Sequence, residues 1–221
     1  METLSPVALA ARRLLASLAP GGPRLIIGMA GVPGSGKSTL AAQIAAAVNA
    51  ETAPDTMVAL GMDGFHLTRA ALRLLPDPAA ALARRGAPWT FAPQVLALRL
   101  DDLRAAYGRA DCAWPGFAHE VGDPVEDALI VPASSRIVMV EGLYLLHRAD
   151  GWGVVSARFD ERWYLDAPLD LAMGWLALRH MRAWGFSREQ AEDRIAANDR
   201  PNAAIVVESA AAADWRLTAE D

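Results

Sequence analysis

The stretch of sequence that decides the fold runs from residue 24 to residue 39 and reads RLIIGMAGVPGSGKST. Its first seven residues are mostly apolar and rich in branched side chains, which predicts a buried β-strand. A glycine-rich turn follows, and the alanine-rich residues 38–48 after it predict a helix. Residues 31–38 match the pattern G-x-x-x-x-G-K-[ST] at every fixed position, in the strand–turn–helix context that this pattern needs.

The chemistry behind this pattern is phosphate binding. Backbone N–H groups can surround a triphosphate only where side chains are absent, and the helix adds the positive end of its dipole. Lys37 can reach the β and γ phosphates, and the Ser38 hydroxyl can ligate Mg²⁺. We therefore expect the whole loop to bind a nucleoside triphosphate, namely Gly31, Val32, Pro33, Gly34, Ser35, Gly36, Lys37, Ser38 and Thr39.

Further strands and helices alternate along the chain. Apolar runs predict strands at 57–62, 136–140 and 162–166, and apolar spacing predicts helices at 92–107 and 169–184. Alternating strands and helices predict an α/β fold, a P-loop NTPase three-layer sandwich with a mostly parallel sheet, helices on both faces and a helical lid. Ligands bind beyond the carboxyl ends of such strands, where Asp63 and Glu141 are expected to meet the loop.

The remaining segments receive weaker predictions. Residues 67–83 are expected to be helical or irregular, residues 110–132 to be rich in turns with one short strand at 128–131, and residues 198–202 to form a turn. We expect one P-loop domain over 1–221, with an N-terminal helix and linker in 1–22 and the helical lid in 170–200.

Two carboxylates are candidates for catalysis. Asp63 can accept a proton from an attacking hydroxyl or hold Mg²⁺ through water, or it can simply begin a turn before Gly64; the residues alone do not decide. Glu141 directly follows an apolar strand, where P-loop proteins place an acidic residue near the metal. Ser38, Asp63 and Glu141 are therefore the expected metal ligands. The GTPase motifs Asp-x-x-Gly and Asn-Lys-x-Asp do not occur at the corresponding places.

Composition narrows the class of protein. The chain has 221 residues, a net charge of −5 and a pI near 5.4, which argues against sequence-independent binding of nucleic acid. Cys112 is the only cysteine and suits a buried structural thiol in a reducing compartment, so we expect a cytoplasmic protein. No apolar run has membrane-spanning length, and no membrane insertion is expected. Trp152, Trp163 and Trp175 are expected in the core, and a homodimer is left open.

Several motifs together resemble one superfamily. They are residues 31–39, the MDGFH of 62–66, the DPV of 123–125, the VEGLYL of 140–145, and the pairs at 179–180, 198–199 and 202–203. In this order they resemble the phosphoribulokinase, uridine kinase and pantothenate kinase superfamily of P-loop kinases, most closely the small bacterial members described as nucleoside kinase-like or fructose-transport-system kinases. The resemblance implies that Asp63 is the general base and that Glu141 supports the metal and substrate site. It also implies ATP and Mg²⁺ as cofactors.

The acceptor site is expected close to the proposed base. Phe65 and His66 follow Asp63 and are expected to bind the acceptor. Residues 115–119 resemble a family segment that contacts the acceptor. Ala118 replaces the aspartate usual there, which leaves His119 as the candidate for a polar contact. The neighbouring basic residues of 84–85 are interpreted as a solvated pair.

A lid is expected from the end of the 169–184 helix. Arg179 and Arg182 lie there, Gly185 permits a break, and a Ser187–Gln190 capping box begins the next helix. Arginines on such a helix pair can close over the phosphates. Phe186 stands where the superfamily has a further lid arginine, so that Arg182 or Arg188 would substitute. The alternative is that these arginines cap a helix or are solvated.

The residues and the resemblance lead to one main hypothesis. It is an ATP-dependent small-molecule kinase with a hydroxyl acceptor, possible acceptors being a sugar such as fructose, a nucleoside or pantothenate. Its expected catalytic residues are Lys37, Asp63, Glu141 and Arg179. The alternative is a nucleotide-binding regulatory P-loop protein associated with sugar transport, with little or no turnover. The intact loop and carboxylates argue against that alternative.

Overall fold

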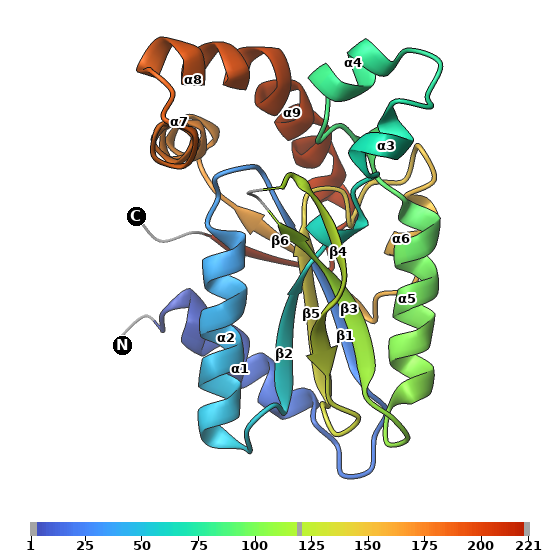
Figure 1. Cartoon of the computed structure of the whole chain (residues 1–221). Coiled ribbons are helices and arrows are strands. Elements are labelled where there is room, and N and C mark those ends of the chain that lie inside the picture. Colours follow the sequence, from blue (N-terminus) through green and yellow to red (C-terminus); the bar gives the residue numbers. More distant parts are fainter. Residues whose placement is uncertain (1–3, 119–120, 219–221) are drawn as a thin grey trace.

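The computed structural model describes residues 4–118 and 121–218, and its centre is a parallel sheet with the strand order β2-β5-β1-β6-β7 (Figure 1). Its strands are β1 (Leu25–Gly31), β2 (Met57–Gly61), β5 (Ile137–Gly142), β6 (Glu161–Asp166) and β7 (Trp215–Thr218). In the register of the sheet, Glu141 lies opposite both Met29 of β1 and Gly61 of β2. The continuous apolar run of β1 is what a strand covered on both faces requires.

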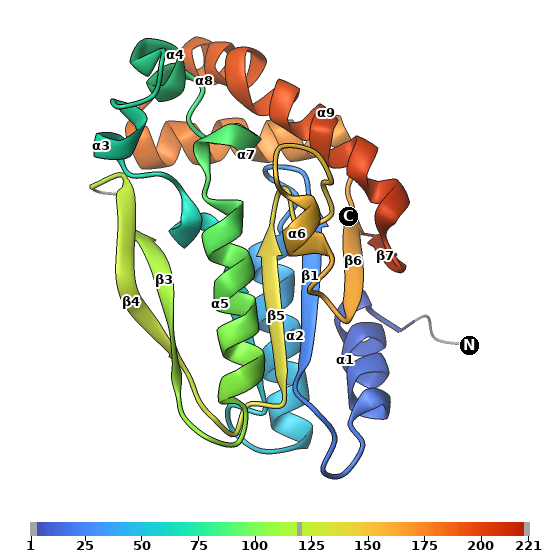
Figure 2. The ribbon, with the colours of Figure 1, turned by 90° about the vertical axis from the view of Figure 1, so that its right-hand side faces the viewer.

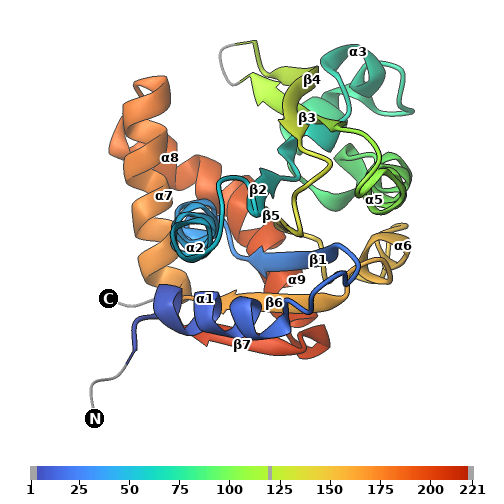
Figure 3. The same cartoon turned by 90° about the horizontal axis from the view of Figure 1, so that it is seen from below.

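Helices cover both faces of this sheet (Figures 2 and 3). One layer contains α1 (Pro6–Ser17) and α2 (Lys37–Glu51), and the other contains α5 (Pro93–Ala106), α6 (Gly153–Ser156) and α9 (Arg200–Ser209). Alternate residues of β1 enter the two cores: Ile27 packs with the α1 and α2 side, and Ile26 with the α5 side. The predicted three-layer α/β fold is confirmed.

Short helices stand on the loops at the carboxyl ends of the strands. On one side of the sheet edge lie η1 (Asp63–Phe65), α3 (Arg69–Leu72), α4 (Pro78–Ala83) and η2 (Pro88–Thr90). On the other lie α7 (Leu169–Trp184) and α8 (Arg188–Arg194) (Figure 1). Gly185, with φ +67°, ends α7, and Ser187 and Gln190 form the capping box of α8. The predicted break and restart are thus confirmed.

The segment predicted to be rich in turns forms a β-hairpin instead. Its antiparallel strands are β3 (Cys112–Ala118) and β4 (Asp123–Val131). The prediction of a single short strand was wrong because Pro115, Gly116 and Pro124 are residue types depleted in strands. Most of β4 is also exposed, so that its sequence lacks the alternation of a half-buried strand. The indole Nε1 of Trp114 donates to the carbonyl oxygen of Gly61 at 2.9 Å, which holds the hairpin against the end of β2.

The turn predicted at 198–202 is helical in the structure. Residues Ile195–Asp199 form a π-helical turn, η3, that continues directly into α9, and η4 (Ala210–Ala212) and β7 follow. Pro201 lies inside this continuous helix, directly after the π-helical turn, and cannot donate a backbone hydrogen bond. The carbonyl oxygen of Ala197, four residues earlier, accepts from Nη1 of Arg84 instead. Asn198 and Asn202 are buried, and the Asn198 Nδ2 donates to the carbonyl oxygen of Arg85 at 3.0 Å. Contacts distant in sequence therefore override a composition that is typical of turns.

Three residues that were predicted to be buried are buried, and a fourth is not. Trp152 and Trp163 are fully buried, and Cys112 is buried as well. Trp175 is 44% exposed on the outer side of α7. Only one face of α7 is packed against the protein, and Trp175 lies on the other face. The apolar character of tryptophan alone does not predict which face it occupies.

Candidate active site

The glycine-rich loop between β1 and α2 has a backbone suited to phosphate binding. Gly34 and Gly36 have φ of +79° and +81°, in the left-handed region that favours glycine. A Cβ on Gly34 would lie 2.2 Å from the carbonyl oxygen of Ala172, so the loop packs tightly against α7. Gly36 caps α2 without a side-chain acceptor, and the first turn has no acidic residue. The first N–H groups of α2 are therefore suited to an anion.

Lys37, Ser38 and Glu141 meet at the carboxyl ends of β1 and β5. The Ser38 hydroxyl donates a 2.9 Å hydrogen bond to Oε1 of Glu141. Burial lowers the pKa of Lys37 against the attraction of Glu141 and Asp63, and burial raises the pKa of Glu141 against the attraction of Lys37. Both directions express the cost of taking a charge out of water. A bound triphosphate would offset that cost at Lys37, and a cation would offset it at Glu141.

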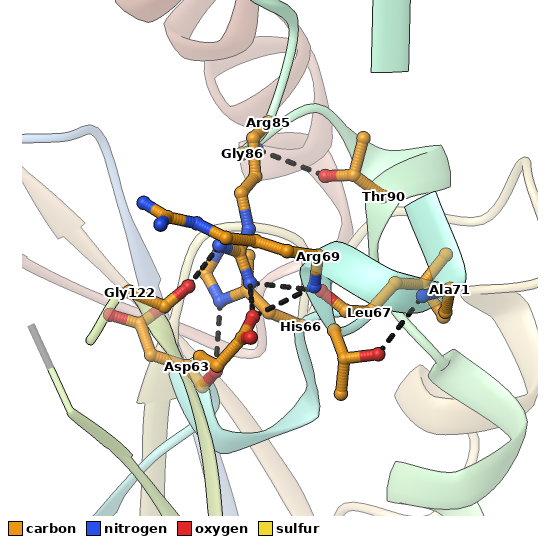
Figure 4. A network of polar contacts seen from close by, with 11 residues as sticks. Asp63, His66, Leu67, Arg69, Ala71, Arg85, Gly86, Thr90 and Gly122 are labelled. Carbon is orange, nitrogen blue, oxygen red and sulfur yellow. Dashed lines mark hydrogen bonds and ion pairs between the residues drawn. The ribbon is translucent and has the colours of Figure 1, made fainter. Parts of the chain in front are cut away.

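Asp63 opens η1 beyond the end of β2, and it lines the same cavity as Lys37, Ser38 and Glu141. The Nδ1 atom of His66 lies 2.8 Å from the carbonyl oxygen of Asp63 (Figure 4). Because a carbonyl oxygen only accepts hydrogen bonds, Nδ1 is the protonated ring nitrogen in this contact. Segments far apart in the chain thus bring a cation, a hydroxyl and two carboxylates to one place.

The aromatic residues on the cavity wall differ from those that sequence reasoning proposed. Phe65 is 3% exposed and packs edge-on against Trp114, with 4.9 Å between ring centroids, so the structure does not bring it to the wall. The wall contains Phe91 and Phe117, whose centroids lie 3.9 and 4.9 Å from that of His66. Neither was proposed as a site residue, although Phe117 lies within the segment 115–119 that resembles the acceptor-contacting segment of the family. His119 lies outside the described residues, and its role stays a prediction.

The lid side of the cavity is built by α7 and α8. Arg179 lines the cavity, together with Trp184 and Arg194. Arg182 does not line it, and lies beside Trp175 in a shallow depression on α7 that Arg179 also borders. Sequence reasoning missed Arg194, whose guanidinium lies 6.0 Å from the Trp184 ring centroid. The capping box located the start of α8, but spacing alone did not show which of its side chains face inward.

The wall across from the lid carries further arginines. Arg69, Arg73 and Arg85 all line the cavity. The interpretation of 84–85 as a solvated pair was wrong. The Arg85 side chain is 13% exposed and pairs with Oδ1 of Asp123 at 2.9 Å, and Arg84 donates to the carbonyl oxygen of Ala197 at 2.7 Å. Arg85 is enclosed because the hairpin packs over it, and Arg84 is half-buried against the segment before α9.

The cavity has a volume of about 690 Å³ and extends from the glycine-rich loop to α3. This size is within the range of ligand and cofactor sites in proteins. It contains donors for phosphates at one end and aromatic and basic side chains at the other. The arrangement can hold two ligands side by side, with Asp63 and Glu141 between them.

The residues of the site fit a metal that binds together with a nucleotide. Within 4–118 and 121–218 no group of three or more His, Cys, Asp and Glu side chains could hold a metal ion without help. Ser38, Asp63 and Glu141 supply one hydroxyl and two carboxylates. Mg²⁺ commonly takes one or two carboxylates and completes its shell with phosphate oxygens and water.

Known proteins are similar to this chain in sequence and in fold. The model of the "Phosphoribulokinase / Uridine kinase family" matches residues 26–216. The "Putative uridine kinase C227.14" of Schizosaccharomyces pombe is 35% identical over 184 residues, which cover 83% of this chain and 78% of the relative. The "ATP-dependent kinase-like protein notR'" of Aspergillus versicolor is 34% identical over 170 residues, which cover 72% of this chain and 98% of the relative.

A solved structure extends the similarity to the fold of nearly the whole chain. The crystal structure of a "putative fructose transport system kinase" from Silicibacter sp. TM1040 has a TM-score of 0.85 and 30% identity, and covers 97% of this chain and 100% of that one. The fold and the loop thus define a P-loop kinase, a phosphotransferase acting on hydroxyl groups of small molecules. The chain belongs to the phosphoribulokinase / uridine kinase family. Enzymes of this class bind ATP together with a divalent metal.

The predictions of family, fold class and kinase activity are therefore confirmed. Among the described helices, none has both the length and the apolar character needed to cross a membrane.

Proposed function

We propose that this kinase transfers the γ-phosphoryl group of ATP to a hydroxyl group of its acceptor in line, with Mg²⁺ as the metal and Asp63 as the general base. The observation that carries the proposal is the shared cavity of Lys37, Ser38, Asp63, Glu141 and Arg179. Phosphoryl transfer needs positioning and charge stabilisation more than covalent chemistry, and these side chains supply both.

The donor half consists of the loop from Gly31 to Thr39 and the start of α2. Its N–H groups would hold the triphosphate, and Lys37 would contact the β and γ phosphates. Arg179 projects from α7 into the cavity and would stabilise the charge on the transferring group. Arg194 is positioned to assist from α8.

The metal would be held by Ser38 and Glu141, with Asp63 contacting it through water. When bound, Mg²⁺ would neutralise charge on the β and γ phosphate oxygens. The hydrogen bond from Ser38 to Oε1 of Glu141 keeps these two groups together at 2.9 Å.

The acceptor half lies beyond Asp63. The Asp63 carboxylate would take the proton of the acceptor hydroxyl as the phosphoryl group is transferred. His66 lies at the junction of Asp63 with the aromatic residues Phe91 and Phe117 and would help to orient the acceptor. Phe65 would support His66 from the core, and His119 is a further candidate.

The identity of the acceptor is the finer part of the proposal. A sugar such as fructose, a nucleoside and pantothenate are all hydroxyl compounds that suit this cavity by size. The names of the relatives point to uridine and to fructose transport. We also propose that the chain works as one kinase domain with a lid over 170–200, and that it is cytoplasmic; a homodimer stays a prediction.

A screen for ATP consumption over sugars, nucleosides and pantothenate, with mass identification of the product, tests the function. The variant Asp63→Asn should reduce phosphoryl transfer by about 10² to 10⁴ while ATP affinity stays nearly unchanged, because only the base and water-mediated metal contacts are lost. Near-normal turnover of this variant would refute the assignment of Asp63. Tight ATP binding without transfer to any acceptor would favour the regulatory alternative.

A further inference from the structure

The cavity is rich in positive charge although the chain is acidic overall. Six of its lining residues are basic, Lys37, Arg69, Arg73, Arg85, Arg179 and Arg194, and three are acidic, Asp63, Glu141 and Asp199. The whole chain has a net charge of −5. The proposed ATP site accounts for Lys37, Arg179 and Arg194. The three arginines near α3 belong to the other end and need a separate explanation.

Arg85 has its charge compensated within the protein. Its Nη2 lies 2.9 Å from Oδ1 of Asp123 and 2.9 Å from the carbonyl oxygen of Leu67, and its Nη1 donates to the carbonyl oxygen of Gly122. Its guanidinium also lies 5.3 Å from the ring centroid of Phe117. Arg85 therefore holds the β3–β4 hairpin to the segment after η1, and Asp123 is already engaged by it.

The guanidinium groups of Arg69 and Arg73, in contrast to that of Arg85, have no ion-pair partner among the described residues. They stand four residues apart on α3 and the turn that ends it, where like charges repel each other. Within the described part of the chain, no carboxylate lies within ion-pair distance of either guanidinium. The backbone N–H of Arg69 donates to Oδ1 of Asp123 at 2.8 Å, but no dashed line reaches its guanidinium in Figure 4.

The Arg69 side chain extends along the cavity wall toward the hairpin. Figure 4 shows it crossing the Arg85 side chain beside His66. A Cβ placed on Gly122 would lie 2.7 Å from Nη2 of Arg69, which locates this guanidinium at the inner end of β4. In Figure 1, α3 lies on the opposite side of the sheet edge from α7, which carries Arg179. The Arg69 and Arg73 charges thus face the acceptor end of the cavity.

We propose that the acceptor of this kinase is anionic, with a carboxylate or phosphate group that Arg69 and Arg73 bind while its hydroxyl faces Asp63. The inference rests on the kinase function proposed above and specifies its substrate class. An anion between the two guanidinium groups would offset their repulsion and form charge-assisted hydrogen bonds, which guanidinium groups make with carboxylate or phosphate oxygens in bidentate geometry. The acceptor would then be fixed at both ends.

Matched pairs of acceptors that differ in one anionic group test this substrate class. Suitable pairs are pantothenate with pantothenol, glycerate with glycerol, and fructose 6-phosphate with fructose. The anionic member of at least one pair should have a kcat/KM about 10-fold to 100-fold higher than its neutral partner, the range for a hydrogen bond to a charged group. The three pairs also distinguish a carboxylate from a phosphate.

Variants of Arg69 test whether its guanidinium binds the anionic group of the acceptor. Arg69→Gln should raise the KM of the anionic acceptor about 10-fold to 100-fold, with little change in the KM of ATP, and Arg69→Lys should restore part of the loss. Arg109→Gln removes the same charge from an exposed position after α5, outside the cavity, and should leave both constants unchanged.

Two results would overturn the proposal while leaving the kinase function intact. One is efficient transfer to neutral acceptors that Arg69→Gln does not affect. The other is a rise in the KM of ATP in Arg69→Gln, which would assign this charge to the donor. If no acceptor is phosphorylated at all, the kinase proposal fails. Calorimetric titration of the ADP-loaded protein with the same acceptor pairs then decides the anion site alone, and equal affinity within every pair would refute it.

Discussion

The Ser38 hydroxyl donates a hydrogen bond of 2.9 Å to Oε1 of Glu141, although 103 positions separate the two residues in the chain. Ser38 lies in the first turn of α2 after the glycine-rich loop, and Glu141 is the second-last residue of β5, which pairs with β1 in parallel. Parallel pairing places the carboxyl ends of β1 and β5 side by side, so the donor loop and the carboxylate share one edge of the sheet.

Removing the charge of Glu141 should weaken the metal site. Glu141→Gln keeps an oxygen that can accept from Ser38 but loses the carboxylate charge. We expect kcat to fall by about 10² to 10³ and the Mg²⁺ concentration for half-maximal activity to rise. Steady-state kinetics over a Mg²⁺ series measure both. Glu51→Gln, at the far end of α2, is the matched control. An unchanged Mg²⁺ dependence in Glu141→Gln would contradict the metal assignment.

A methyl group on the phosphate loop should damage it sterically. Gly34→Ala places a Cβ 2.2 Å from the carbonyl oxygen of Ala172 at φ +79°. We expect ATP affinity to fall at least about tenfold and the free energy of unfolding to drop by about 1–3 kcal/mol. ATP titration and urea unfolding measure these effects.

Gly174→Ala is the control for this change. Gly174 lies in α7, and a Cβ there meets nothing within 4 Å. Alanine is the better helix former, so the free energy of unfolding should rise by about 0.5–1 kcal/mol with ATP affinity unchanged. Equal effects of the two substitutions would show that the conformation of Gly34 is unimportant.

Arg179 and Arg182, the two arginines first assigned to the lid, should contribute differently to kcat. Arg179 lines the cavity as well as the depression that contains Arg182, whereas Arg182 does not line the cavity. Arg179→Gln should lower kcat by about 10² or more, because it removes a donor to the transferring group. The fall in kcat caused by Arg182→Gln should be at least about tenfold smaller than the fall caused by Arg179→Gln. Single-turnover transfer rates at saturating ATP make the comparison. Equal losses would mean that lid closure brings Arg182 to the phosphates as well.

The ion pair that holds the hairpin should make stability depend on pH. Burial opposes the shift, but hydrogen bonds from the Arg69 backbone and the Arg85 guanidinium lower the pKa of Asp123. A carboxyl whose pKa is lowered on folding stabilises the protein above its unfolded-state pKa of about 3.9, and this contribution is lost as pH falls through the folded-state value.

Asp123→Asn tests this dependence. The variant should be less stable than the parent by about 1 kcal/mol at pH 7, and the difference should shrink on acidification toward pH 3. Urea unfolding midpoints at pH 7, 5 and 3.5 measure it. Asp214→Asn removes the ion pair with Arg162, far from the cavity. This variant shows whether stability is lost on acidification at any exposed ion pair or at Asp123 in particular. A difference for Asp123→Asn that stays constant over this range would contradict the ion-pair contribution.

Local sequence patterns predicted the regular helices and strands well. They failed where tertiary packing determines the secondary structure. The glycine-rich loop, the strand at 136–140 and the capping box at Ser187 are determined by nearby residues, and the structure has all of them. The β3–β4 hairpin and the helix through Asn198 contain proline, glycine and asparagine, whose local preferences point to turns. Burial of Trp114 and Asn198 outweighs those preferences.

The candidate site shows the same division. Lys37, Ser38, Asp63 and Glu141 lie at or just beyond the carboxyl ends of strands, and this rule of parallel sheets predicts that they lie close together. The positions of Phe91, Arg85 and Arg194 depend on how distant loops pack against one another. The spacing of residues in the sequence does not predict this packing.

The sequence by itself determined the family, the parallel sheet and the phosphate-binding half of this kinase, because each depends on short motifs whose backbone demands are local. Only the tertiary structure decided which side chains face the acceptor. It buried Phe65 against Trp114, kept Arg182 out of the cavity, and left Arg69 and Arg73 on the cavity wall. The reason is physical: the direction of a side chain in a loop or on a short helix is determined by the segments packed against it, and these come from distant parts of the chain.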